Sequence, residues 1–148
     1  MAVPITIESF ERLEIPVESW THRAHLTVAY LYLRELPLEE AIARMRSGLG
    51  AILAHFQIQQ TATQGYHETL TVAWMRIIAA MMAAYGPCDS PDAFLEQHPH
   101  LTSRFLLRLY YTRPRIMSAQ ARAGFVEPDL APLPALVSPP HAQPDRPQ

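Results

Sequence analysis

Apolar residues recur along most of this chain at the three- and four-residue intervals that place them on one face of an α-helix. The spacing predicts three long helices and three shorter ones, over residues 19–34, 37–56, 66–85, 91–98, 101–111 and 114–124. No segment shows the sustained alternation of apolar and polar residues that is typical of a half-buried strand. We therefore predict an all-α fold, a helical bundle of three main helices with short helices at its C-terminal side.

Proline and glycine mark the ends of the predicted helices, because a proline has no backbone N–H to donate within a helix. Ser90-Pro91 combines a capping side chain with a proline and predicts a helix start, and Gly86-Pro87 predicts a helix end. Half of the 14 prolines lie in residues 128–148, which we predict to be a disordered tail after a helical domain over residues 1–127.

Two glycines interrupt the apolar face of the predicted helix 37–56. Gly48 and Gly50 each weaken a helix by about 1 kcal/mol relative to alanine. Their presence therefore suggests that another helix or a ligand approaches this face closely.

Composition and charge exclude several classes of protein. The formal net charge is −2 and the 12 basic residues are scattered, which argues against nucleic acid as a partner. The longest apolar stretch, residues 70–85, is shorter than the ~20 residues that span a bilayer, so we expect no membrane segment. Residues 1–10 do not resemble a signal peptide, and the single cysteine, Cys88, fits a reducing compartment. These features favour a cytoplasmic protein and leave its oligomeric state open.

Three histidines fall on predicted inward faces near helix starts. His22 and His25 are three residues apart, which places them about 60° apart on one helix face. His67 opens the third long helix. In an up-down-up bundle the first and third helices run parallel, so their N-termini share one end of the bundle. We therefore expect the three imidazoles to lie close together.

This arrangement suggests metal chemistry. Neutral imidazole is the commonest metal ligand, and three histidines with one open position suit a divalent metal such as zinc or non-haem iron. The leading hypothesis is a small metal-dependent enzyme or metal-binding protein with His22, His25 and His67 as ligands. The candidate catalytic residues are Glu68, as an acid/base catalyst or fourth ligand, and Tyr66. Hydrolysis and oxidation both stay open as reactions.

The same residues support other interpretations. Thr71 stands where the zinc-protease motif His-Glu-x-x-His would have its second histidine, so that motif is absent. A metal-free module would use the histidines and Arg46 to bind a polar or anionic small molecule in an apolar cavity. The candidate ligand-binding side chains are Trp20, Arg46, Thr71, Trp74 and Arg122.

Two further alternatives carry no small-molecule chemistry. The three inward histidines would be purely structural if backbone groups or water satisfied them. An interaction protein would instead act through its proline-rich tail. The remaining histidines are predicted to lie on the surface, and they are His55, His98, His100 and His141.

Several motifs together resemble a known family. The segments 20–26 (Trp-Thr-His-Arg-Ala-His-Leu) and 65–71 (Gly-Tyr-His-Glu-Thr-Leu-Thr) carry the resemblance. They are joined by Met45-Arg46-Ser47-Gly48, Tyr110-Tyr111 and the stretch 118–130. The pattern is similar to that of an uncharacterised family of small bacterial helical proteins and covers residues 20–130. The resemblance implies no activity, but such shared polar positions are more typical of a site than of a core.

Overall fold

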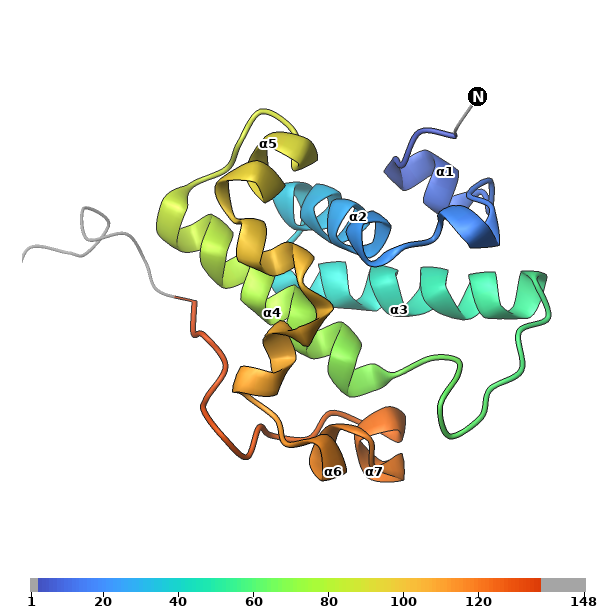
Figure 1. Ribbon diagram of the computed structural model, residues 1–148. Coiled ribbons are helices and arrows are strands. Elements are labelled where there is room, and N and C mark those ends of the chain that lie inside the picture. Colours follow the sequence, from blue (N-terminus) through green and yellow to red (C-terminus); the bar gives the residue numbers. More distant parts are fainter. Residues whose placement is uncertain (1–2, 137–148) are drawn as a thin grey trace, which may run out of the picture.

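Three long helices form the centre of the molecule in the computed structural model, which describes residues 3–136 (Figure 1). They are α2 (His22–Glu35), α3 (Leu38–His55) and α4 (Glu68–Tyr85), and each packs against the other two. The described residues contain no strand. The predicted all-α bundle with three main helices is therefore confirmed.

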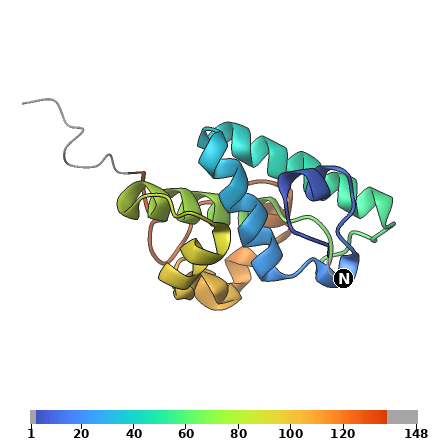
Figure 2. The same ribbon diagram turned by 90° about the horizontal axis from the view of Figure 1, so that it is seen from above.

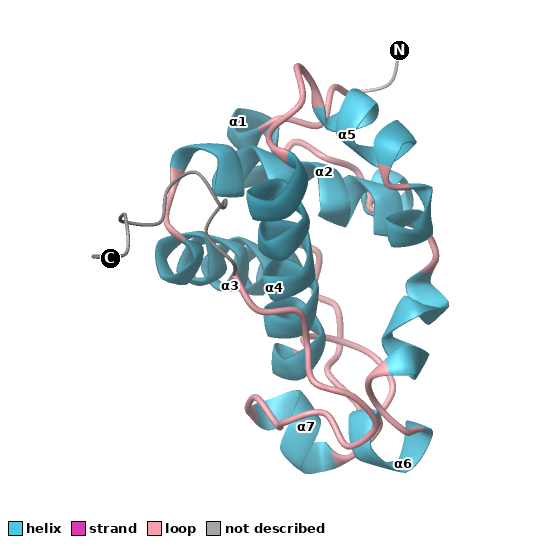
Figure 3. Ribbon diagram, turned by 90° about the vertical axis from the view of Figure 1, so that its left-hand side faces the viewer, coloured by secondary structure: helices cyan, strands magenta, loops and turns pink. Residues whose placement is uncertain are grey.

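Shorter helices cover this centre, as the view from above shows (Figure 2). Helix α1 (Ile7–Glu11) packs against α2 on one side, and α5 (Pro91–Gln97) packs against α2 on another. Helix α7 (Ala119–Ala123) lies against α4, with α6 (Arg113–Ile116) beside it (Figure 3). Residues 3–136 also contain three short 3₁₀ helices, and they are η1 (Val17–Ser19), η2 (Pro99–Thr102) and η3 (Arg104–Leu109).

Capping side chains explain where the helices begin. Helix α5 starts at Ser90, as predicted, and the Ser90 side chain accepts a hydrogen bond from the Ala93 N–H. Helix α2 starts later than predicted, because η1 occupies residues 17–19 and Thr21 rather than Ser19 caps the helix. The predicted helix over residues 114–124 is two helices, because Ser118 caps α7 and starts a new turn after α6.

The predicted α-helix over residues 101–111 is wrong. Ser103 ends η2, and its side chain accepts the Phe105 N–H to start η3, so two 3₁₀ segments replace one helix. With three residues per turn, the inward positions shift. Leu101 and Leu107 are buried, whereas Phe105 and Leu109, which α-helical spacing from Leu101 would place on the inward face, are 53% and 63% exposed.

The segment after α7 returns along the body of the protein. The Thr112 N–H and hydroxyl donate to the Asp129 carboxylate at 2.8 and 2.6 Å, and the Leu130 N–H donates to the Tyr110 carbonyl at 2.9 Å. Leu133 packs against the core. Residues 128–136 of the predicted tail thus contact the helical part, and residues 137–148, including His141, lie outside the described residues.

The largest fully buried side chains between the helices are aromatic. Tyr30 and Phe94 are fully buried and their rings stack at 4.7 Å. The Tyr30 hydroxyl donates to the Cys88 carbonyl and accepts the Cys88 N–H, so its polar end is satisfied. In the described range, no helix combines the length and apolar character needed to cross a membrane.

Gly48 provides the close approach that the sequence suggests for this helix. A Cβ atom at Gly48 would lie 2.1 Å from a ring carbon of Phe10, so the missing side chain makes room for that ring on α3. Phe10 in turn stacks on Trp20 at 5.3 Å. By contrast, a Cβ atom at the exposed Gly50 would meet nothing within 4 Å.

The two glycines give a matched pair of substitutions. We expect Gly48→Ala to lower the free energy of unfolding by about 1–3 kcal/mol, because the new methyl group displaces Phe10. Gly50→Ala should raise it by about 0.5–1 kcal/mol, because alanine favours the helix and meets no neighbour. Urea unfolding measures both, and equal stabilisation by the two changes would contradict the Phe10 contact.

Candidate functional site

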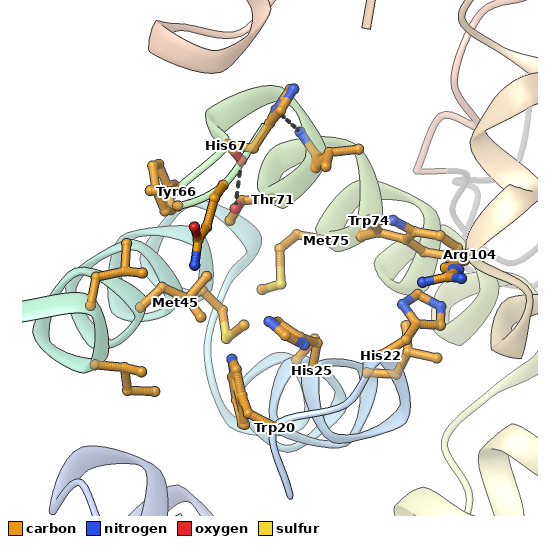
Figure 4. Close-up of a pocket in the computed structure, with 18 of the residues that line it drawn as sticks. Trp20, His22, His25, Met45, Tyr66, His67, Thr71, Trp74, Met75 and Arg104 are labelled. Carbon is orange, nitrogen blue, oxygen red and sulfur yellow. Dashed lines mark hydrogen bonds between the residues drawn. The ribbon is translucent and has the colours of Figure 1, made fainter. Parts of the chain in front are cut away.

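A cavity of about 630 Å³ lies where α2, α3 and α4 meet (Figure 4). The loop before α4 and the start of η3 also contribute to its wall, and the cavity is open to solvent on one side. Its volume falls in the range of small-molecule sites in proteins. Most of its wall is apolar, with contributions from Leu26, Met45, Leu49, Leu70, Met75 and Ile78.

Two histidines of α2 line this cavity, and each uses only one of its two ring nitrogens in a hydrogen bond to the backbone of residues 3–136. The His25 Nδ1 donates to the Thr21 carbonyl at 2.8 Å, which leaves Nε2 as an acceptor. The His22 Nε2 donates to the Leu101 carbonyl at 3.0 Å, which leaves Nδ1 as an acceptor. Burial lowers the pKa of both rings, so they are neutral at physiological pH.

Each of these two histidines packs against one tryptophan. The ring centroids of Trp20 and His25 are 4.3 Å apart, and those of Trp74 and His22 are 4.7 Å apart. Both tryptophans also line the cavity, as Figure 4 shows. Since the full chain has only 2 tryptophans and both line the cavity, indole fluorescence reports on this cavity alone.

His67 has a different role, although it too contributes to the cavity wall. It caps α4, with its Nδ1 accepting the Leu70 N–H at 3.1 Å, while its Nε2 donates to the Ile116 carbonyl at 2.8 Å. Its side chain is turned away from His22 and His25 (Figure 4). The residue is only 8% exposed, and burial lowers its pKa. Both ring nitrogens are therefore already engaged with the backbone.

This geometry does not fit a three-histidine metal centre. A metal ion at His67 would have to displace either the helix cap or the bond to Ile116. Among residues 3–136, no three His, Cys, Asp or Glu side chains are grouped so that they could hold a metal ion. The metal-dependent function stays a prediction that the described geometry does not support.

Glu68 and Tyr66, the candidate catalytic residues, are engaged with Arg46. The Arg46 guanidinium donates to both carboxylate oxygens of Glu68, at 3.0 and 2.7 Å, and the Tyr66 hydroxyl donates to Glu68 at 2.5 Å. The Arg46 hydrogen bonds hold the pKa of Glu68 below its usual range. Burial and the bond to Glu68 raise the pKa of Tyr66 to about 12. Glu68 is therefore an ionised carboxylate engaged beside the cavity.

The structure divides the candidate ligand-binding residues into two groups. Trp20, Thr71 and Trp74 line the cavity, but Arg46 and Arg122 do not. Arg122 donates to the Tyr66 carbonyl at 3.1 Å, and Arg46 binds Glu68, which accepts the Tyr66 hydroxyl. Tyr66 itself lines the cavity wall.

Sequence reasoning missed two cavity residues at the start of η3, Arg104 and Phe105. α-Helical spacing over residues 101–111 places Phe105 on the inward face with Leu101 and gives Arg104 no special position. The 3₁₀ turn started by Ser103 places both residues at the cavity instead.

His98 is buried, which corrects its predicted surface position. It is 6% exposed, with its ring 4.8 Å from the ring of Phe94 and 5.2 Å from that of Tyr85. Its Nε2 has no hydrogen-bond partner in the described part of the chain, and burial lowers its pKa. His55 and His100 are exposed, as predicted.

No protein-family model, curated protein or solved structure matches this chain. The resemblance to a bacterial family therefore stays a prediction. The function has to be argued from the geometry of the cavity.

The dual role of His67 can be tested by substitution. We expect His67→Ala to lower the free energy of unfolding by about 2 kcal/mol, because the α4 cap and the Ile116 bond are both lost. His67→Asn should recover about 1 kcal/mol, because asparagine also caps helices. Urea unfolding in a chelating buffer measures both. A wild-type stability that falls when the chelator is added would contradict this assignment and favour a metal.

Stability should also decrease with falling pH. His22, His25, His67 and His98 have folded-state pKa values below the ordinary 6.5, so below that pH the unfolded chain binds more protons than the folded one. We expect the free energy of unfolding to be level above about pH 7 and to fall between about pH 7 and pH 5.

The buried His98 gives a sharp variant for this measurement. His98→Leu should make the decrease with pH shallower, because it removes a buried group that resists protonation. Substituting the exposed His55 with glutamine is the control and should leave the slope unchanged. A stability that rises as the pH falls from 7 to 5 would be inconsistent with neutral buried imidazoles.

Proposed function

We propose that this protein binds a small, largely apolar molecule in the cavity between α2, α3 and α4, without a metal ion. One observation carries the proposal. The apolar cavity of about 630 Å³ is faced by two neutral imidazoles, His22 and His25, each with one ring nitrogen that has no hydrogen-bond partner among residues 3–136. Small-molecule sites combine such an apolar wall with a few placed polar groups.

The wall residues match this role in their chemistry. Trp20 and Trp74 offer flat aromatic surfaces against which a ring or a chain packs. Met45 and Met75 are flexible and polarisable, so they adapt to the shape of an apolar ligand. The acceptor nitrogens of His22 and His25 would receive hydrogen bonds from a hydroxyl or N–H group of that ligand.

A neutral fluorescent probe tests the proposal. We expect N-phenylnaphthylamine to bind with a saturable signal at one site, and to receive energy from Trp20 and Trp74 because both line the cavity. Leu70→Phe, which fills part of the cavity from α4, should weaken binding about ten-fold, because probe and side chain compete for the same space.

Leu33→Phe is the matched control. Leu33 is a half-buried leucine of α2 that lies outside this cavity, so its substitution should leave probe affinity unchanged. Circular dichroism would establish that both variants are folded. The proposal fails if the probe does not saturate on wild type, or if folded Leu70→Phe binds it as well as wild type does.

A further inference from the structure

The described wall of the cavity carries positive charge and no negative charge. Among the described residues that line the cavity, Arg104 alone carries a formal charge at neutral pH, and none is aspartate or glutamate. The nearby carboxylate of Glu68 is already bound by Arg46 at 2.7 Å. The cavity therefore presents one cation and no carboxylate to whatever enters it.

Arg104 is placed to use that charge. Its guanidinium lies beside His22 and Trp74 at one end of the cavity (Figure 4). It lies 5.5 Å from the Phe105 ring centroid, but within residues 3–136 it has no ion-pair partner. Burial is the main cause of the lowered pKa of His22, and the positive charge of Arg104 lowers that pKa further.

The sequence around Arg104 adds further positive charge and no negative charge. No aspartate or glutamate occurs in residues 97–126, whereas five arginines do, and they are Arg104, Arg108, Arg113, Arg115 and Arg122. An unpaired guanidinium next to an apolar cavity is the arrangement that recognises a carboxylate, because its planar fork donates two parallel hydrogen bonds.

We infer that the ligand is an amphipathic organic anion, an aliphatic or aromatic acid whose carboxylate binds Arg104 while its apolar part fills the cavity. This inference rests on the proposed function and adds the chemical class of the ligand. The apolar part would lie along Met45, Met75 and Ile78, away from the charged end.

Two probes that differ in one charged group test the inference. Anilinonaphthalene sulfonate shares the ring system of N-phenylnaphthylamine and adds an anionic sulfonate. We expect wild type to bind the anionic probe about ten-fold more tightly than the neutral one, and Arg104→Gln to abolish this preference. Arg104→Gln should still bind the neutral probe with a saturable signal, which shows that its cavity is intact.

Arg108→Gln is the matched control. Arg108 lies on the same 3₁₀ helix with its guanidinium 4.4 Å from the Phe105 ring, but it does not line the cavity. This variant should keep the preference for the anionic probe. A dodecanoate titration should displace the anionic probe from wild type and about ten-fold less effectively from Arg104→Gln.

The outcomes separate the two proposals. Saturable binding of both probes with equal affinity would overturn the anionic class and leave the proposed function standing. Equal losses in Arg104→Gln and Arg108→Gln would also overturn it, since they would show a general charge effect. If neither probe binds wild type, the proposed function fails and the inference fails with it.

Discussion

The first turn of α4 fastens the C-terminal segment to the helical bundle, and the shape of the cavity depends on that attachment. His67 joins the start of α4 to Ile116 through its second ring nitrogen. Two residues later the buried Thr69 hydroxyl donates to the Gly124 carbonyl and accepts the Val126 N–H. These bonds are shielded from water, so losing one partner would leave a buried polar group unsatisfied. They place α7 beside the start of α4, where Arg122 donates to the carbonyl of Tyr66 in the cavity wall.

This constraint changes how the three histidines are understood. Similar side chains at neighbouring helix starts serve two purposes, because their hydrogen bonds differ. His67 uses both ring nitrogens to hold the backbone, while His22 and His25 each keep one for the cavity. Three further side chains have structural roles. Arg46 binds Glu68, and Arg122 binds the backbone carbonyl of Tyr66. Among the described residues that line the cavity, Arg104 has a charge that no ion pair compensates within residues 3–136, and it gives the cavity its proposed preference for anions.

The long helices and their inward faces could be predicted from the sequence, because apolar periodicity and proline positions report directly on local structure. The placement of Trp20, Thr71 and Trp74 at one cavity follows from the same patterns. Tertiary contacts decided the rest. Periodicity does not reveal that Ser103 breaks a helix into 3₁₀ turns, which is why Arg104 was missed. Periodicity also does not reveal that the Nε2 of His67, which a metal would need, donates to the carbonyl of the distant residue Ile116.

The central claim is that an apolar acid occupies the cavity between Trp20 and Trp74. Since the chain has 2 tryptophans and both line this cavity, their indole N–H signals in a ¹H–¹⁵N NMR spectrum test the claim directly. During a titration with dodecanoate, both signals should shift and saturate together at one equivalent of ligand. Indole signals that stay in place while only surface amides shift would contradict the account.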